Sequence, residues 1–441
     1  MKKRINSLSL VPFGVFLVFY LGLSLWSKDF YAVPMPVAFI AASAAALIMG
    51  KSSLEEKIDI YAKSMGESNI MLMVMIFILA GAFAAVAKSS GAVDAAVIIA
   101  RHLIPDNLLA GGIFLVSCFI SLAIGTSCGT IAALTPIAVA LAGASGLSTP
   151  LLLGAVVGGA MFGDNLSMIS DTTIAATRTQ ETAMKDKFKI NIKFALPAAG
   201  AVLLIYFFTV KTGNAVPAPP ALTWHHIVLV TPYAAILLCA ILGLNVMMLL
   251  FTGTVAALLI GCCCGSFPLL SGIGAAGKGT LGMAETLIVA LLAGGLLGTI
   301  RHNGGIDYLI EKIEKAIHSP RGCEFGCALL VTLVNLFTAN NTVAIVVAGP
   351  VARELSLKYG CDNKRIAAIL DSSSCVAQGL IPYGAQILIA LGVAKSSGIT
   401  IPAVELLKVL YYPMLLAAGL IIFITLGGRP PEKSEGKINY A

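Results

Sequence analysis

Long apolar runs separated by short polar segments dominate the chain. About ten runs reach 17 residues or more, and a helix of that length crosses the hydrocarbon core of a bilayer. The first run follows the basic segment Met1 to Arg4, and no A-x-A cleavage site follows Trp26, so we interpret it as a spanning helix rather than a signal peptide. The pattern predicts an all-α polytopic membrane protein.

Composition supports this class. Of 441 residues, 58% are hydrophobic and 12% are charged, against roughly 25% charged in soluble proteins. The net charge of +7 does not indicate nucleic-acid binding, because the basic residues lie in short loops without interleaved aromatic residues. Most of the ten cysteines lie inside apolar runs, and Cys323 and Cys327 have no neighbouring histidine or second cysteine pair, so neither a disulfide framework nor a metal site is predicted.

The chain contains an internal repeat. The segment Ser90 to Asp94 (SGAVD) matches Asn303 to Asp307 (NGGID), and Gly125 to Thr130 (GTSCGT) then falls opposite Phe337 to Thr342 (FTANNT). A polar, proline-rich stretch separates the two copies. We therefore divide the chain into an N-terminal repeat (1–210), a linker (211–223), a C-terminal repeat (224–428) and a cytoplasmic tail (429–441).

Each repeat is expected to make five crossings and one re-entrant hairpin, so the second repeat enters the membrane from the opposite side. With the N-terminus cytoplasmic, 22 of the 29 Lys and Arg residues fall inside, as the positive-inside rule requires. The prediction is about ten spanning helices and two hairpins, with both termini cytoplasmic in a bacterial inner membrane. Inverted repeats with paired broken helices are typical of secondary transporters, whose site lies at the repeat interface.

Four polar breaks interrupt the apolar runs, and each is a candidate site because freed backbone groups must be satisfied by protein or by water in a cavity. They are Gly125 to Thr130, Gly163 to Thr173, Thr338 to Thr342 and Asp371 to Gly384. Hydroxyls and amides at these breaks either cap half-helices or supply oxygen ligands to a hard cation, and the sequence leaves both interpretations open.

The second break carries two carboxylates, Asp164 and Asp171. A carboxylate at the centre of a spanning helix costs roughly 2.5 to 3.5 kcal/mol on insertion scales, so the pair implies a compensating cation or proton. Oxygen donors without sulfur or imidazole suit Na⁺, and we predict Asp164 and Asp171 as its ligands. The alternative is that one of these aspartates only caps the following half-helix.

This break closely resembles the G-D-x-x-S-x-x-S-D-T-T motif of the NhaC family of sodium/proton antiporters, and Gly125 to Thr130 resembles that family's G-T-S-x-G-T hairpin. The resemblance extends over nearly the whole chain. It implies a fold of the ion-transporter superfamily type and carries the family's ion site over to Asp164, Ser167, Ser170, Asp171, Thr172 and Thr173.

Two departures from the family are visible. Members often have Lys after the first Asp and Pro after the first Ser, where this chain has Asn165 and Met168. Replacing a cation with an amide is expected to leave the site more negative. The family also contains exchangers of organic acids and amino-acid permeases, so the resemblance does not fix the cargo.

The ion- or substrate-binding residues that we predict come from both repeats. In the first repeat they are Thr126, Ser127, Thr130, Asp164, Asn165, Ser167, Ser170, Asp171, Thr172 and Thr173. In the second they are Asn340, Asn341, Thr342, Asp371, Ser373 and Gln378.

The expected function is exchange of Na⁺ or Li⁺ for H⁺ by alternating access, with both ions competing for the aspartates and reorientation requiring a neutralised Asp171. No cofactor is expected besides the transported ions. The alternative is an Na⁺- or H⁺-coupled permease for an amino acid or carboxylate, held by Asn340, Asn341 and Gln378. The sequence leaves a monomer and a homodimer open.

An intramembrane enzyme is not expected. Gly143 to Gly146 has the G-x-S-G form of membrane serine proteases, but all five histidines fall at segment ends or in loops. The near P-loop at Gly272 to Lys278 has Gly279 where the Mg²⁺-binding hydroxyl is needed, so no nucleotide site is implied either.

Overall fold

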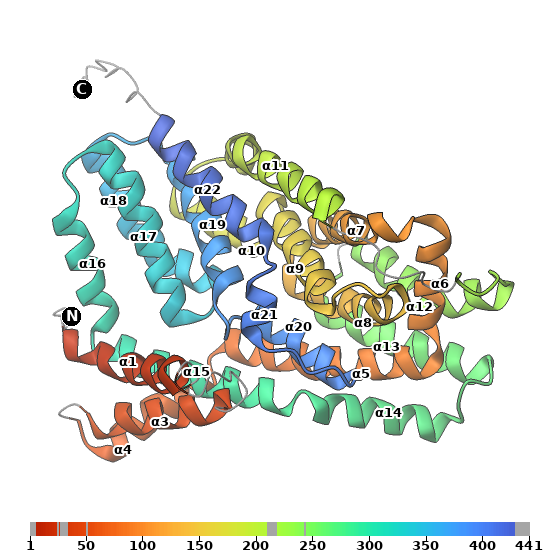
Figure 1. Ribbon diagram of the computed structural model, residues 1–441. Coiled ribbons are helices and arrows are strands. Elements are labelled where there is room, and N and C mark those ends of the chain that lie inside the picture. Colours follow the sequence, from red (N-terminus) through yellow and green to blue (C-terminus); the bar gives the residue numbers. More distant parts are fainter. Residues whose placement is uncertain are drawn as a thin grey trace, which may run out of the picture.

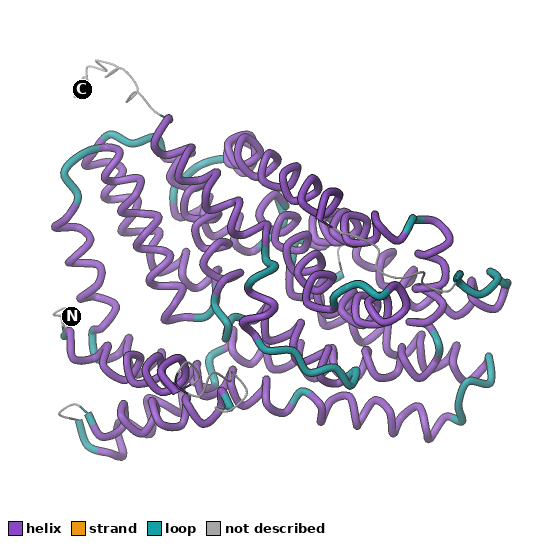
Figure 2. Tube along the Cα trace, in the orientation of Figure 1, coloured by secondary structure: helices purple, strands orange, loops and turns teal. Residues whose placement is uncertain are grey.

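The computed structural model describes residues 6–23, 26, 34–49, 52–209, 218–241 and 244–427. These residues form helices and no strand (Figures 1 and 2), and nine segments among them are long and apolar enough to cross a membrane. The predicted class, an all-helical polytopic membrane protein, is confirmed. Residues 211–217 of the predicted linker and the predicted tail at 429–441 lie outside the described residues.

The two halves of the chain have similar series of helices, with the short helix α21 as an additional element of the second half. The first half contains α1 (Val11–Leu17), α3 (Met35–Ile48), α4 (Leu54–Met65), α5 (Ser68–Ser90), α6 (Ala92–Leu103), α7 (Leu109–Ile124), α8 (Ser127–Ser145), α9 (Thr149–Leu166), α10 (Asp171–Thr179) and α11 (Met184–Thr209). The second contains α12 (Trp224–Ile241), α13 (Val246–Cys263), α14 (Leu269–Gly282), α15 (Ala284–His302), α16 (Gly305–Ala316), α17 (Pro320–Thr338), α18 (Asn341–Tyr359), α19 (Asn363–Leu380), α20 (Ala385–Ser396), α21 (Ala403–Leu407) and α22 (Tyr411–Leu426). Helices α18, α19 and α20 each begin 214 residues after α8, α9 and α10.

The helix breaks have local causes. Gly125 follows the last residue of α7 and Ala339 follows that of α17. Both have positive φ (75° and 47°), a conformation that stops a helix and that a non-glycine residue adopts at a cost. Helix α19 ends just before Pro382, which has no N–H to continue the helix. A polar segment thus separates α9 from α10 in the first half, and an equivalent segment separates α19 from α20 in the second; both are short loops (Figure 2).

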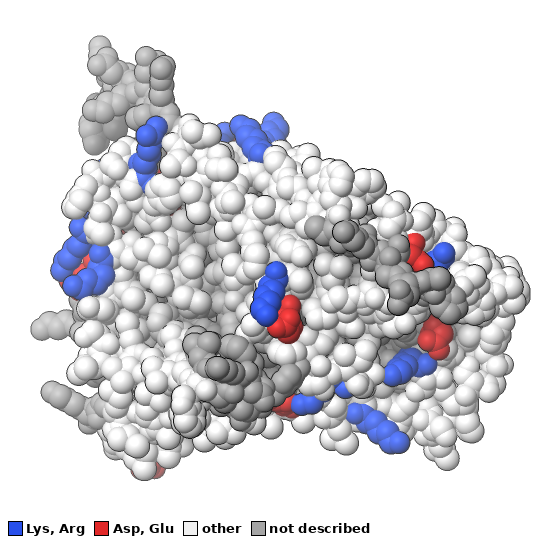
Figure 3. All heavy atoms as spheres, viewed as in Figure 1, with Lys and Arg blue, Asp and Glu red and all other residues white. Residues whose placement is uncertain are grey.

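The surface agrees with a lipid environment. Figure 3 shows charged side chains at a few places on this face, with broad areas of other residues between them. Large apolar side chains such as Phe119, Leu204 and Phe208 are exposed, as expected for helices that face hydrocarbon.

Small residues bring α9 against α7. A Cβ on Gly159 would lie 2.3 Å from the carbonyl oxygen of Phe114, and one on Gly163 would lie 2.5 Å from that of Cys118. This glycine pair four residues apart lets two membrane helices touch backbone to backbone. The contact fixes the end of α9, where Asp164 follows Gly163.

The same kind of contact recurs in the second half. Ser121 Oγ donates to the carbonyl oxygen of Ala160 at 2.5 Å, and Asn335 Nδ2 donates to that of Ser374 at 2.8 Å. Each residue of the second pair lies 214 positions after its counterpart in the first. The α7/α9 and α17/α19 pairs are therefore joined by equivalent hydrogen bonds.

We expect Gly163→Ala to lower the thermal unfolding midpoint of the purified protein, because its Cβ meets a rigid backbone oxygen and overpacking costs about 1–3 kcal/mol. Gly143→Ala is the matched control, since a Cβ on that α8 glycine meets nothing within 4 Å. Equal midpoints for the two variants would contradict the close α7/α9 contact.

Candidate functional site

Asp164 lies at the C-terminal end of α9, immediately before the break, and is 8% exposed. Its carboxylate accepts hydrogen bonds from Ser127 Oγ at 2.7 Å and from Ser170 Oγ at 2.5 Å. Ser170 Oγ lies 2.9 Å from Thr172 Oγ1, and Gln386 Nε2 donates to Ser127 Oγ at 3.0 Å. Asp164 is thus surrounded by a hairpin end, a helix break and, through Gln386, helix α20 of the other repeat.

The donors to Asp164 are neutral. Within the described ranges Asp164 forms no ion pair, and the side chains that donate hydrogen bonds to it are the hydroxyls of Ser127 and Ser170. A carboxylate with neighbouring hydroxyl oxygens is a donor set for a hard monovalent cation, and it is also a site that a proton neutralises.

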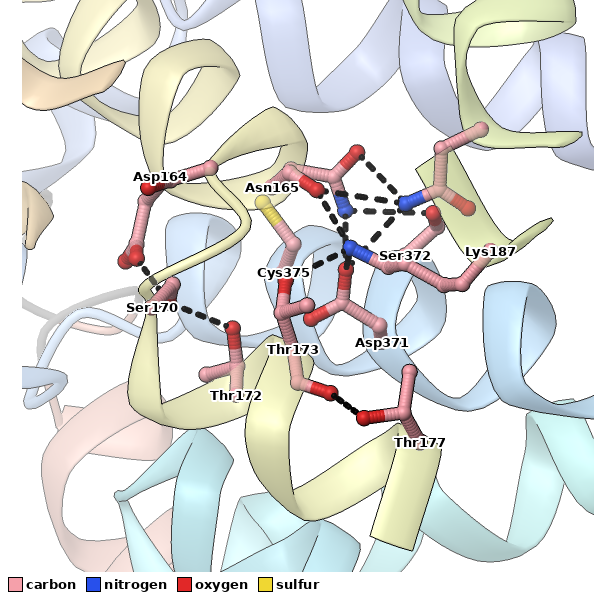
Figure 4. Close-up of polar contacts among 12 residues, drawn as sticks. Asp164, Asn165, Ser170, Thr172, Thr173, Thr177, Lys187, Asp371, Ser372 and Cys375 are labelled. Carbon is pink, nitrogen blue, oxygen red and sulfur yellow. Dashed lines mark hydrogen bonds and ion pairs between the residues drawn. The ribbon is translucent and has the colours of Figure 1, made fainter. Parts of the chain in front are cut away.

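Asp371 has a different environment. It lies on α19, is 1% exposed, and its Oδ2 is 2.5 Å from Lys187 Nζ of α11. Asn165 Nδ2 and Asn191 Nδ2 also donate to this oxygen, at 3.0 and 3.2 Å. Figure 4 shows this group beside the Asp164, Ser170 and Thr172 group, with the consecutive residues Asp164 and Asn165 linking the two.

Lys187 is 1% exposed and its ammonium group is fully engaged. Besides Asp371, it donates to the carbonyl oxygen of Asn165 at 2.6 Å and to Thr173 Oγ1 at 2.8 Å. The positive-inside count includes Lys187 among the cytoplasmic basic residues, and Asn165 is expected to leave the site more negative. In the structure α11 instead supplies a buried cation directly beside Asn165, which offsets that loss of positive charge.

Asp171 lies apart from these networks. It is the first residue of α10, it is exposed, and it forms no ion pair in the described part of the chain. Ser170, rather than either aspartate, occupies the N-cap position, although its side chain makes no capping bond. A carboxylate in the first turn still interacts favourably with the helix dipole.

Several predicted residues satisfy the backbone of the breaks. Ser167 Oγ donates to the carbonyl oxygen of Leu122 at 3.0 Å, and Thr130 Oγ1 donates to that of Thr126 at 3.1 Å. Asn340 Oδ1 accepts from Val343 N and so caps α18. The remaining hairpin residues, Thr126, Asn341 and Thr342, are half-buried.

Gln378 is the counterpart of Asp164, 214 positions later, and is 1% exposed. Its Nε2 donates to the carbonyl oxygen of Ala339 at the second hairpin end, at 2.9 Å, and its Oε1 has no hydrogen-bond partner. Ser373 Oγ and Asp371 Oδ1 are likewise buried and unpartnered. The second repeat therefore has an amide where the first has a carboxylate.

Sequence reasoning missed Lys187, Asn191 and Gln386. Lys187 and Asn191 are four residues apart, so they share one face of α11, and an asparagine between Ile190 and Ile192 was the available signal. Gln386 follows the Pro382 break directly, at the start of α20.

Comparison with known proteins identifies the family. The model of the Na⁺/H⁺ antiporter family matches residues 7–211 and 215–428. The chain belongs to this family. The resemblance to NhaC proteins is confirmed, and the chain is a multi-pass membrane transporter of the antiporter type rather than a member of an enzyme family.

Curated relatives differ in the cargo that their names give. The Na⁺/H⁺ antiporter NhaC of Bacillus subtilis is 24% identical over 86% of this chain and 89% of that protein. The malate-2H⁺/Na⁺-lactate antiporter of the same organism is 19% identical over 85% and 86%. The arginine/ornithine antiporter ArcD of Halobacterium salinarum is 24% identical over 73% and 72%.

Among solved structures, the YdaH transporter of Alcanivorax borkumensis matches 80% of this chain and 85% of its own, with 15% identity and a TM-score of 0.43.

The buried ion pair generates a stability prediction. We expect Lys187→Met to destabilise the protein by about 3–5 kcal/mol, since removing one partner of a buried pair leaves the other charge uncompensated. The double variant Lys187→Met/Asp371→Asn, which removes both charges, is expected to melt at a higher temperature than the single variant.

Lys364→Met is the control, because the Lys364–Asp186 pair (3.0 Å) is partly exposed and a surface pair contributes about 0–1 kcal/mol. A double variant no more stable than Lys187→Met would contradict the assigned pairing.

Proposed function

We propose that the chain exchanges Na⁺ or Li⁺ for H⁺ across the bacterial cytoplasmic membrane, with both termini cytoplasmic and with Asp164 as the group for which the two ions compete. The observation that carries the proposal is the contrast between the two buried aspartates. Lys187 neutralises Asp371, whereas Asp164 has serine hydroxyls as partners and, among the residues that the structure describes, no ion pair with a cation.

The hydroxyl groups around Asp164 suit both ions. When Asp164 is ionised and binds neither ion, the hydroxyls of Ser127 and Ser170 donate hydrogen bonds to its carboxylate. When Na⁺ is bound, the same hydroxyls rotate and present their lone pairs, and Thr172 Oγ1 beside Ser170 adds another neutral oxygen. When a proton is bound, the carboxyl group becomes a donor and needs no metal. Each ion therefore removes the same buried negative charge and excludes the other.

Asp171 takes an auxiliary role in this proposal. Its exposed position in the first turn of α10 does not provide the desolvated pocket that makes a proton compete with Na⁺. A carboxylate there attracts cations toward the break that contains Ser170.

An organic cargo remains the alternative, because two relatives are named for malate/lactate and arginine/ornithine exchange. The residues that would hold it are less available than the sequence suggests: Asn340 caps α18, and the amide nitrogen of Gln378 is bonded to the second hairpin. The NhaC relatives and the family support ion exchange instead.

We expect Asp164→Asn to abolish exchange and Asp171→Asn to retain it with reduced apparent Na⁺ affinity. The measurement is ²²Na⁺ uptake driven by a pH gradient in proteoliposomes, with Li⁺, malate and arginine as competing solutes. Robust uptake by Asp164→Asn would refute the assignment, and inhibition by malate or arginine but not by Li⁺ would favour the organic cargo.

Competition also predicts the pH dependence of Na⁺ binding. Stabilisation of the purified protein by Na⁺ should weaken as pH falls, because protonated Asp164 no longer binds the cation, and the half-saturating Na⁺ concentration should rise up to about tenfold per pH unit. Thermal unfolding at a series of Na⁺ concentrations and pH values measures this. An Na⁺ affinity that is independent of pH across the range of exchange would contradict a shared site.

A further inference from the structure

An open apolar groove runs between α11 and α22, on the outside of the molecule. Its volume is about 470 Å³, within the range of small-ligand sites, and α11 lines it with Phe194, Ala198 and Ala201 while α22 lines it with Leu415, Ala418 and Ile422. Figure 1 shows these two helices side by side. From residue 193 to residue 201, α11 rises by roughly 12 Å, enough for much of an acyl chain.

The groove has a local cause. Pro197 in the interior of α11 has no N–H for the carbonyl group of Lys193, and such a residue bends a helix. On the opposite wall, Ala418 and Gly419 of α22 present little side-chain volume. The two helices contact each other at Phe194, where a Cβ on Gly419 would lie 3.4 Å from the carbonyl oxygen of Phe194, and the Phe194 and Phe423 ring centroids are 5.0 Å apart.

One end of the groove is strongly basic. Lys193 lines it, and Lys189 and Lys185 follow at intervals of four residues, so the three exposed lysines share one face of α11. Figure 3 shows Lys and Arg side chains gathered where α11 begins.

Nearby acidic groups do not cancel this charge. Asp186 is paired with Lys364 at 3.0 Å, and Glu324 holds Arg365 in two bonds of 2.7 and 2.8 Å. The guanidinium carbon of Arg365 lies 4.0 Å from the centroid of the Phe423 ring, a cation–π contact at the same end of the groove. The three lysines therefore remain as excess positive charge.

We propose that this groove binds an anionic phospholipid, with its phosphate at Lys189 and Lys193 and an acyl chain along α11 and α22. The positive-inside rule places this end in the cytoplasmic leaflet. A basic cluster beside an apolar groove matches such a lipid in both charge and polarity. A second copy of the chain fits less well, because a two-fold contact would set the lysine face against itself.

The test uses the full chain in neutral detergent and measures retained lipid by native mass spectrometry and the unfolding midpoint. The probes are phosphatidylglycerol, phosphatidylcholine with the same acyl chains, and inorganic phosphate. We expect phosphatidylglycerol alone to be retained and to raise the midpoint. Lys189→Gln/Lys193→Gln should weaken its binding roughly 25-fold, at about fivefold per lysine.

Ala418→Phe should also reduce lipid retention while leaving the lysines in place, because the exposed Ala418 lines the groove. Matched controls are Leu196→Phe, which adds bulk at an exposed position of α11 outside the groove, and Lys278→Gln, at an exposed lysine on α14. Both control variants should retain phosphatidylglycerol to the same extent as the unmodified chain.

Three results would overturn the proposal. They are equal retention of the two phospholipids, equal stabilisation by inorganic phosphate, and a lipid-independent dimer that Ala418→Phe dissociates, which would assign the groove to a second copy.

Discussion

The architecture depends on how two carboxylates are tolerated inside a membrane protein. A buried ionised carboxylate needs a cation, a proton or a complete set of hydrogen bonds. Asp371 receives a cation from the chain itself, at 2.5 Å from Lys187. Asp164 receives hydroxyl donors, which reduce the cost of burial without cancelling the charge. One carboxylate is thereby neutralised within the chain, and the other is the one that we propose binds a mobile ion.

The repeat explains how two similar halves come to differ in chemistry. Equivalent hydrogen bonds join α7 to α9 and α17 to α19, so the backbone positions of Asp164 and Gln378 correspond. Gln378 is bonded to a hairpin carbonyl and has no proton to exchange at cellular pH. In the proposed mechanism proton coupling is therefore confined to the first half, while the second half supplies Gln386 and Asp371 as supports of the site.

Much of the fold was predictable from the sequence. Apolar run length predicts the helices, and the matched breaks predict paired hairpins and broken helices, because hydrocarbon permits few other backbone arrangements. The Gly163 to Thr173 motif likewise identifies Asp164, Ser170 and Thr172 as neighbours. The helices, their breaks and this motif each involve residues that are close in sequence, so the local sequence pattern is sufficient to predict them.

The pairing of charges was not predictable in the same way. Lys187 stands in a segment with four other basic residues, and only tertiary packing turns it inward while Lys185, Lys189 and Lys193 remain exposed. For the same reason the sequence could not separate Asp164 from Asp171. The two are seven positions apart, but the break at residues 167–170 lies between them, leaving one buried and the other exposed.

The polar residues at the breaks serve structure and function together. Each interruption frees backbone groups, and in the described residues Ser167, Asn340 and Gln378 satisfy carbonyl or N–H groups at these points. Ser127 and Ser170 differ because their hydroxyls point at a carboxylate instead. A hydroxyl bonded to the backbone holds the break in shape, whereas the proposed mechanism requires one bonded to Asp164 to change partner whenever an ion enters. The proposed site therefore lies where other residues already satisfy the backbone, which leaves the hydroxyls of Ser127 and Ser170 for the ion that we propose.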